Sequence, residues 1–104
     1  MRVMCFDTMA ANRVCYYINK PGCIIVDIRD ANEYAKGHIP SAINIPADKL
    51  HQYTNYLSKY DQVILYCSRG NQSLLSAKSL SFGRAKIISL YGGIRAYRGE
   101  LVKG

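Results

Sequence analysis

The stretch VILYCSRGNQS, residues 63–73, indicates the fold class of this chain of 104 residues. Its first four residues have the length and the β-branched content of a buried strand, and a cysteine follows directly. A polar turn around Gly70 comes next, and the sequence LLSAKSL after it is typical of a helix. A strand, a tight turn and a helix in this order indicate an α/β unit.

Apolar runs of strand length recur along the chain. With β-branched residues in each, they predict strands at 3–6, 23–28, 42–45, 63–66 and 86–90, and most of the segments between them look helical. Near-continuous apolar runs separated by helices are typical of parallel strands that are covered on both faces. The length suits a single domain over residues 1–104. We therefore expect one α/β domain.

Two turns follow predicted strands. Asp30 and Glu33 have the spacing of a capping box, so a short helix should begin at Ala31, end at a left-handed Gly37 and be stopped by Pro40. Further along, a glycine pair at 92–93 leads from a strand into a helix-like segment at 94–101. This second turn and the turn at 67–72 both lie at carboxyl ends of predicted strands, where open parallel sheets bind their ligands.

Charge and apolar content limit the kinds of partner. Fourteen Lys and Arg against seven Asp and Glu give a net charge of +7, which favours an anionic partner. The basic residues are scattered without a run of three, so we expect no nucleic-acid partner. The strongest apolar run, 23–26, is too short to cross a bilayer, and the first residues show no signal-peptide core. We expect no membrane partner and a cytoplasmic location.

The cysteines favour neither a disulfide framework nor a metal site. A cytoplasmic location would keep the thiols reduced, and none stands in a C-x-x-C pair. His38 and His51 do not complete a spacing typical of zinc ligands. We therefore expect no metal and no cofactor. The four cysteines are Cys5, Cys15, Cys23 and Cys67.

Cys67 has two interpretations. A cysteine at the end of a buried strand is often a small core residue, and that is our interpretation of the other three cysteines. At Cys67, however, Gly70 allows a tight turn, and the N–H groups of 68–73 together with the helix start would form an anion-binding cup. Such a cup favours a nucleophilic thiolate that carries a sulfane sulfur as a persulfide, with Arg69 drawing in an anionic donor.

Three segments, taken in order, resemble the rhodanese, or sulfurtransferase, family. Residues 24–46, IIVDIRDANEYAKGHIPSAINIP, resemble its D-x-R-x-x-x-E-[YF]-x-x-G-H-I-P-x-A-x-x-[IL]-P signature nearly throughout. Residues 63–73 resemble its catalytic loop, in which a glycine stands three positions after the cysteine. Residues 88–101, ISLYGGIRAYRGEL, resemble its L-x-G-G-x-x-x-[WY] ending, with Tyr97 at the aromatic position.

The resemblance implies a five-stranded, mostly parallel sheet flanked by helices on both faces. It also implies that the Cys67 thiolate takes the outer sulfur of a small sulfur-containing anion and passes it to a thiol or protein-cysteine acceptor. The implied substrate-binding loop consists of Ser68, Arg69, Gly70, Asn71 and Gln72. Many thiosulfate-using members carry arginine where this chain has Ser68, and Arg, Lys or Thr where it has Gln72, so thiosulfate and a persulfide or polysulfide both stay open as donors.

Two other functions stay open. One is a non-catalytic rhodanese-like interaction module, against which the retained Cys67 argues. The other is a phosphatase or arsenate reductase of the C-x5-R type, which needs an arginine where this chain has Ser73. For Asp27 and His38 we expect structural roles, and Arg29 has the i, i+4 spacing of an ion pair with Glu33.

Overall fold

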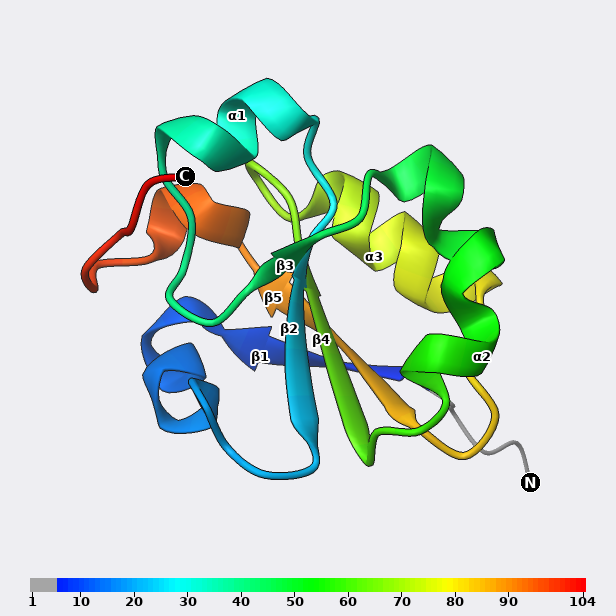
Figure 1. Cartoon of the computed structure of the whole chain (residues 1–104). Coiled ribbons are helices and arrows are strands. Elements are labelled where there is room, and N and C mark those ends of the chain that lie inside the picture. The colour runs from blue at the N-terminus through cyan, green and yellow to red at the C-terminus, as the bar shows by residue number, and fades with distance from the viewer. Residues whose placement is uncertain (1–5) are drawn as a thin grey trace.

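A single parallel sheet forms the centre of the structure, a computed structural model that describes residues 6–104. The strand order is β1-β5-β4-β2-β3, and every pairing between neighbouring strands is parallel (Figure 1). This confirms the α/β class and the five-stranded sheet, which is parallel throughout. The strands are β1 (Phe6–Ala10), β2 (Cys23–Asp27), β3 (Ile43–Asn44), β4 (Gln62–Tyr66) and β5 (Lys86–Tyr91).

Helical segments cover both faces of the sheet (Figure 1). One face packs against η2 (Ala47–Tyr53), α2 (Thr54–Leu57) and α3 (Asn71–Ser79). The other face packs against η1 (Ala11–Tyr17) and η3 (Gly93–Ala96). The helix α1 (Ala31–Lys36) has no buried residue and lies beyond the carboxyl end of β2. None of the helices among the described residues is long and apolar enough to cross a membrane.

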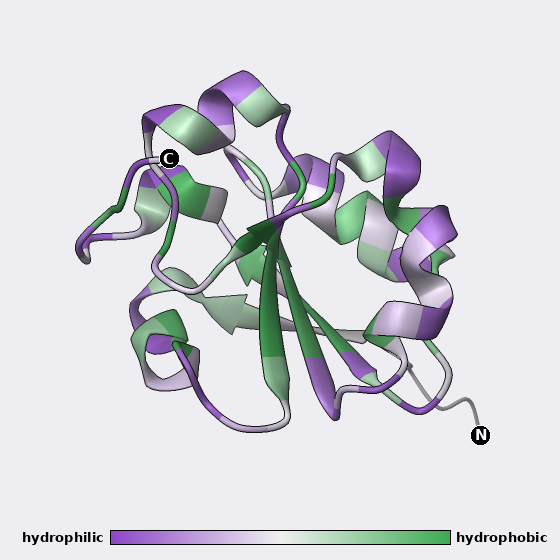
Figure 2. Ribbon diagram, viewed as in Figure 1, coloured by the Kyte–Doolittle hydropathy of each residue, from purple (hydrophilic) through white to green (hydrophobic). Residues whose placement is uncertain are grey.

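Alternation along the central strands divides the core in two. In β2, Ile24 and Val26 face α2 and α3, whereas Ile25 faces η1, because successive side chains of a strand point to opposite faces. Because both faces of the central strands are buried, the strands appear as near-continuous apolar bands, with polar residues mainly on the helices (Figure 2). Each fully buried aliphatic side chain contributes roughly 1.5–3 kcal/mol, so these two layers supply most of the folding energy.

The predicted turns agree with the structure in part. The helix begins at Ala31 as predicted, and the Asp30 carboxylate accepts the N–H of Glu33 at 3.0 Å. The prediction of a left-handed conformation at Gly37 was wrong, because its φ of 167° is that of extended backbone. The helix predicted at 94–101 is wrong beyond the single turn of η3, because residues 97–101 are not helical. They lead to Val102, which forms an antiparallel bridge with His38.

The strand predicted at 3–6 lies mostly outside the described residues, and Phe6 is the first described residue of β1. The other predicted strands agree with β2, β3, β4 and β5 to within two residues at each end. Propensity located these strands correctly because their apolar runs end at polar or turn residues.

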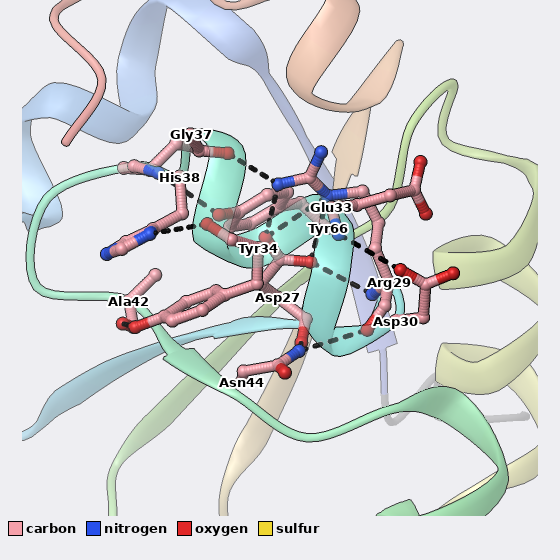
Figure 3. A network of polar contacts seen from close by, with 11 residues as sticks. Asp27, Arg29, Asp30, Glu33, Tyr34, Gly37, His38, Ala42, Asn44 and Tyr66 are labelled. Carbon is pink, nitrogen blue, oxygen red and sulfur yellow. Dashed lines mark hydrogen bonds and ion pairs between the residues drawn. The ribbon is translucent and has the colours of Figure 1, made fainter. Parts of the chain in front are cut away.

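A buried ion pair joins the end of β2 to the turn after α1. The Asp27 carboxylate is fully buried and accepts from Arg29 Nε at 3.0 Å and from Arg29 Nη2 at 2.7 Å (Figure 3). Arg29 Nη2 also donates to the Gly37 carbonyl at 2.7 Å. The expected pair with Glu33 is therefore wrong, because the buried carboxylate two residues away competes for the guanidinium. Burial lowers the pKa of Arg29, but the hydrogen bond and charge of Asp27 outweigh it and raise that pKa overall.

Two rings complete this network. His38 stacks on Tyr34 with 3.7 Å between ring centroids, and its Nδ1 lies 2.9 Å from the Tyr34 carbonyl oxygen, which agrees with a structural role. The Tyr66 hydroxyl accepts the Ile39 N–H at 3.1 Å. Burial, followed by the charge of Asp27, raises the pKa of Tyr66 far above its ordinary value, so the phenol stays protonated.

Arg29→Met should lower the free energy of unfolding by about 3–5 kcal/mol, because it leaves the buried Asp27 carboxylate without its counter-ion. Urea denaturation measures this loss, with the exposed Arg98→Met as the matched control. The double variant Asp27→Asn/Arg29→Met should be more stable than Arg29→Met alone. A single variant as stable as the control would show that the pair does not hold this edge of the sheet together.

Candidate active site

Cys67 follows the last residue of β4, the middle strand of the sheet, and precedes the start of α3 by four residues. The turn between them lies at the carboxyl edge of a parallel sheet, which is the usual ligand edge. Only 4% of Cys67 is exposed. The position of this thiol is thus fixed by the strand on one side and by the helix on the other.

Two backbone donors point at the Cys67 sulfur. Sγ accepts the N–H of Gly70 at 3.1 Å and the N–H of Ser73 at 3.4 Å. A hydroxyl also lies close, because Ser73 Oγ is 3.6 Å from Sγ. Donors that converge on one atom stabilise a negative charge there, and the start of α3 adds its partial positive charge. The arrangement therefore suits an anionic sulfur at position 67.

Glycines allow the chain to approach this closely. Gly70 has a φ of 97°, and a Cβ there would lie 2.9 Å from the Gly92 nitrogen. Gly93 has a φ of 63°, and a Cβ there would lie 2.5 Å from the Cys67 carbonyl oxygen. Both positions need glycine on conformational and steric grounds.

The η3 turn holds the loop in place from behind. The Ile94 N–H donates to the Cys67 carbonyl at 2.9 Å, and the Arg95 N–H donates to the Ser68 carbonyl at 3.1 Å. These two bonds fix the peptide groups on either side of the cysteine. The glycine pair at 92–93 therefore serves the loop at Cys67, which gives the third sequence segment a role in the same site.

Cys67 borders a cavity of about 520 Å³. Four of the predicted loop residues border it, whereas Gly70 gives its N–H to the sulfur instead. Residues from two other segments, which the sequence interpretation did not assign to the site, complete the wall. The lining residues are Ile28, Arg29, Asp30, Glu33, Pro46, Ala47, Asp48, Cys67, Ser68, Arg69, Asn71 and Gln72.

The charge around this cavity opposes the charge of the whole chain. Its lining holds three carboxylates, those of Asp30, Glu33 and Asp48. It also holds two guanidinium groups, but that of Arg29 is already paired with a buried carboxylate. Arg69 is thus left to offset three negative charges, although the chain carries a net charge of +7. The anionic partner expected from net charge is not favoured by the local charge at this cavity.

Two buried serines at the site were not predicted as functional residues. Ser73 does not cap α3 but lies in its first turn, because the helix begins at Asn71 with Gly70 as its N-cap. The Ser73 side chain instead points inward and lies 2.8 Å from Ser89 Oγ on β5. A signal for Ser89 existed in the sequence, because a serine interrupts the apolar run of that strand.

The other cysteines that the structure describes lie away from this cavity. Cys23 donates to Gln62 Oε1 at 2.9 Å, and burial raises the pKa of its thiol. Cys15 is exposed and donates to the Asn12 carbonyl at 3.6 Å. Cys5 lies outside the described residues. Across residues 6–104, no three His, Cys, Asp or Glu side chains gather as a metal ion would require.

Solved structures and characterised proteins resemble the chain. The crystal structure of a rhodanese-like domain protein from Staphylococcus aureus superimposes with a TM-score of 0.80 at 24% identity, over 94% of this chain and 98% of that one. The thiosulfate sulfurtransferase GlpE of Tolumonas auensis is 29% identical over 94 residues, which cover 89% of each chain.

A longer relative matches over part of its length. The putative sulfur carrier protein YrkF of Bacillus subtilis is 31% identical over 77 residues, or 73% of this chain and 42% of that protein. The sequence profile of the rhodanese-like domain matches residues 14–100 of this chain. That match includes the cysteine loop, the acidic side of the cavity and the η3 turn behind the loop. The chain therefore belongs to the rhodanese-like domain family.

Proposed function

We propose that the chain is a sulfurtransferase that carries a sulfane sulfur as a persulfide on Cys67. The observation that carries this proposal is the Cys67 sulfur, which borders an open cavity and accepts two backbone N–H groups. The relatives named as a thiosulfate sulfurtransferase and a putative sulfur carrier support it. The reduced thiol that this chemistry needs fits the cytoplasmic location predicted from the sequence.

The reaction consists of two sulfur exchanges. In the first, the Cys67 thiolate attacks the outer sulfur of the donor, a new S–S bond forms, and the donor leaves with its electron pair as a thiolate or as sulfite. In the second, an acceptor thiolate attacks the outer sulfur of the persulfide, and the Cys67 thiolate leaves. The amide donors of Gly70 and Ser73 stabilise the negative charge that returns to Sγ.

The loop supplies the binding groups for the donor. Ser68, Asn71 and Gln72 border the cavity and offer hydrogen bonds without charge. Arg69 offers the guanidinium that can hold an anionic group. The acceptor is a thiol or a protein cysteine, and the proposed reaction requires neither a metal nor a cofactor, because sulfur itself is both nucleophile and carrier.

The charge of the cavity favours a persulfide donor with a single negative charge over thiosulfate. Thiosulfate carries two negative charges and would approach three carboxylates that are opposed by a single free guanidinium. A persulfide with one anionic sulfur meets less repulsion. The neutral Gln72 in the loop adds no positive charge that would offset this.

Neither alternative function has a supporting observation in the structure. A phosphatase of the C-x5-R type would need a guanidinium at position 73, but the buried Ser73 side chain there bonds to Ser89. An interaction module would not need a cysteine sulfur with two N–H donors beside a cavity.

Incubation with a polysulfide should add one sulfur atom to the intact protein, and Cys67→Ser should abolish the gain. Mass spectrometry of the intact chain measures it, and digestion locates the added atom. The matched control is Cys15→Ser, which removes an exposed thiol away from the cavity and should still gain the atom. Sulfur retained by Cys67→Ser would contradict the proposal.

Glu33→Gln should increase the rate of persulfide formation from thiosulfate by about threefold, because it removes one of the repelling carboxylates. The variant keeps the length of the side chain in the first turn of α1. Added salt should raise the wild-type rate with thiosulfate, since it screens like charges.

The exposed Glu100→Gln serves as the control for this change in charge and should leave the rate unaltered. A slower reaction of Glu33→Gln with thiosulfate would mean that this carboxylate assists the donor, against the account of the cavity given above.

A further inference from the structure

A pair of buried hydroxyls extends from the Cys67 sulfur into the sheet. Ser73 Oγ lies 3.6 Å from Sγ, 3.2 Å from the Gly70 carbonyl oxygen and 2.8 Å from Ser89 Oγ. Ser73 is fully buried and Ser89 is 2% exposed. A serine hydroxyl has one proton and two lone pairs, so each can both accept from one neighbour and donate to another. The three groups therefore form a continuous chain of proton donors and acceptors.

This chain ends at a second cavity. Ser89 borders a space of about 240 Å³ that is separate from the one at Sγ, and Arg69 and Asn71 border both. The loop thus lies between the two cavities, with Cys67 bordering one and Ser89 bordering the other. The remaining residues around the second cavity are Thr8, Gly70, Leu74, Tyr91 and Gly92.

We propose that Ser73 and Ser89 carry the proton of the Cys67 thiol to this second cavity and then act as the side-chain donors that stabilise the thiolate. The proposal rests on the proposed function only in taking Cys67 as the nucleophile. It assigns Ser73 as a catalytic residue, because Ser73 touches the reacting sulfur, and Ser89 as a positioning residue, because Ser89 acts through Ser73.

The proton balance follows from one concerted shift. The Ser73 hydroxyl first turns from the Gly70 carbonyl to Ser89 Oγ. The S–H proton then moves to Ser73 Oγ, the former Ser73 proton moves to Ser89 Oγ, and the former Ser89 proton passes to water in the second cavity. Only S–H and O–H bonds break and form, and nothing is oxidised or reduced. After the shift the Ser73 O–H points at the thiolate and the Ser89 O–H points at Ser73 Oγ, so the departure of the proton also orients both donors.

The second cavity gives the proton an exit that a bound donor does not block. A donor that occupies the first cavity would displace the water nearest to Sγ, whereas Ser89 would stay in contact with the other side of the loop. Ionisation of the thiol and binding of the donor are thereby separated in space.

The serine variants that test this proposal leave the charged and titratable groups around the thiol unchanged. The first cavity presents Arg29, Asp30, Glu33, Asp48 and Arg69, and the second presents Arg69 and Tyr91. A change in pH dependence after removal of a serine hydroxyl would thus arise from the hydroxyl pair.

The experiment measures the rate at which iodoacetamide alkylates Cys67 between pH 5 and 10, read from the mass of the Cys67 peptide. Ser73→Ala should slow alkylation at neutral pH by about tenfold and move the pH midpoint upward, since a hydrogen bond to an anion is lost. Ser89→Ala should slow it by about threefold. The double variant should be no slower than Ser73→Ala, because Ser89 acts only through Ser73.

Ser79→Ala, which removes an exposed hydroxyl from the same helix, is the control and should match the wild type. The proposal would be overturned if the pH profile of alkylation in Ser73→Ala matched that of the wild type. It would also be overturned if the slowing caused by Ser89→Ala added in full to that caused by Ser73→Ala. If Ser73→Ala does not fold, Ser89→Ala against Ser89→Thr decides the matter, because threonine keeps the hydroxyl and should restore the wild-type profile.

Alkylation needs no sulfur donor, so this result is independent of sulfur transfer. A shifted profile in a protein that never gains a sulfur atom would support the hydroxyl pair and contradict the sulfurtransferase. An unshifted profile in variants of a protein that forms the persulfide would support the sulfurtransferase and contradict the role of the hydroxyl pair.

Discussion

Two backbone N–H groups, those of Gly70 and Ser73, meet at the Cys67 sulfur, and the rest of the site is built to keep them there. The strand β4 ends one residue before the cysteine, and α3 begins four residues after it, so the turn has little freedom. The η3 turn then fixes the loop from behind through the Ile94 and Arg95 N–H groups. Because backbone donors cost no reorganisation, a negative charge on sulfur is stabilised before any substrate arrives.

Local arrangement, and not overall charge, decides what this site can bind. The chain carries a net charge of +7, yet the walls beside the sulfur come from the start of α1 and from η2, which bring three carboxylates to the cavity. The buried pair of Asp27 with Arg29 takes up the guanidinium that would otherwise offset them. The same network that stabilises the edge of the sheet thus also sets the charge of the cavity, which under the proposed function couples stability to donor preference.

The sequence predicted the parts of the fold that depend on local order. Near-continuous apolar runs located the strands, and the spacing of Asp30 and Glu33 located the start of α1. Cys67 and its loop could be found because a strand, a glycine turn and a helix follow one another in sequence. Contacts between distant segments could not be read this way, so the expected pair of Arg29 with Glu33 was wrong and the bond between Ser73 and Ser89 went unnoticed. The three carboxylates at the cavity were not predicted for the same reason, because they come from segments distant in sequence from the cysteine loop.

The most direct test of the account is an NMR titration of the backbone amides. Gly70 and Ser73 should show the largest ¹H and ¹⁵N shifts of the loop as Cys67 ionises, with a common pH midpoint that equals the midpoint of Cys67 alkylation. Both shifts should change again when the persulfide forms. Amide shifts at Gly70 and Ser73 that ignore both events would show that these N–H groups do not hold an anionic sulfur, and the site would lose its physical basis.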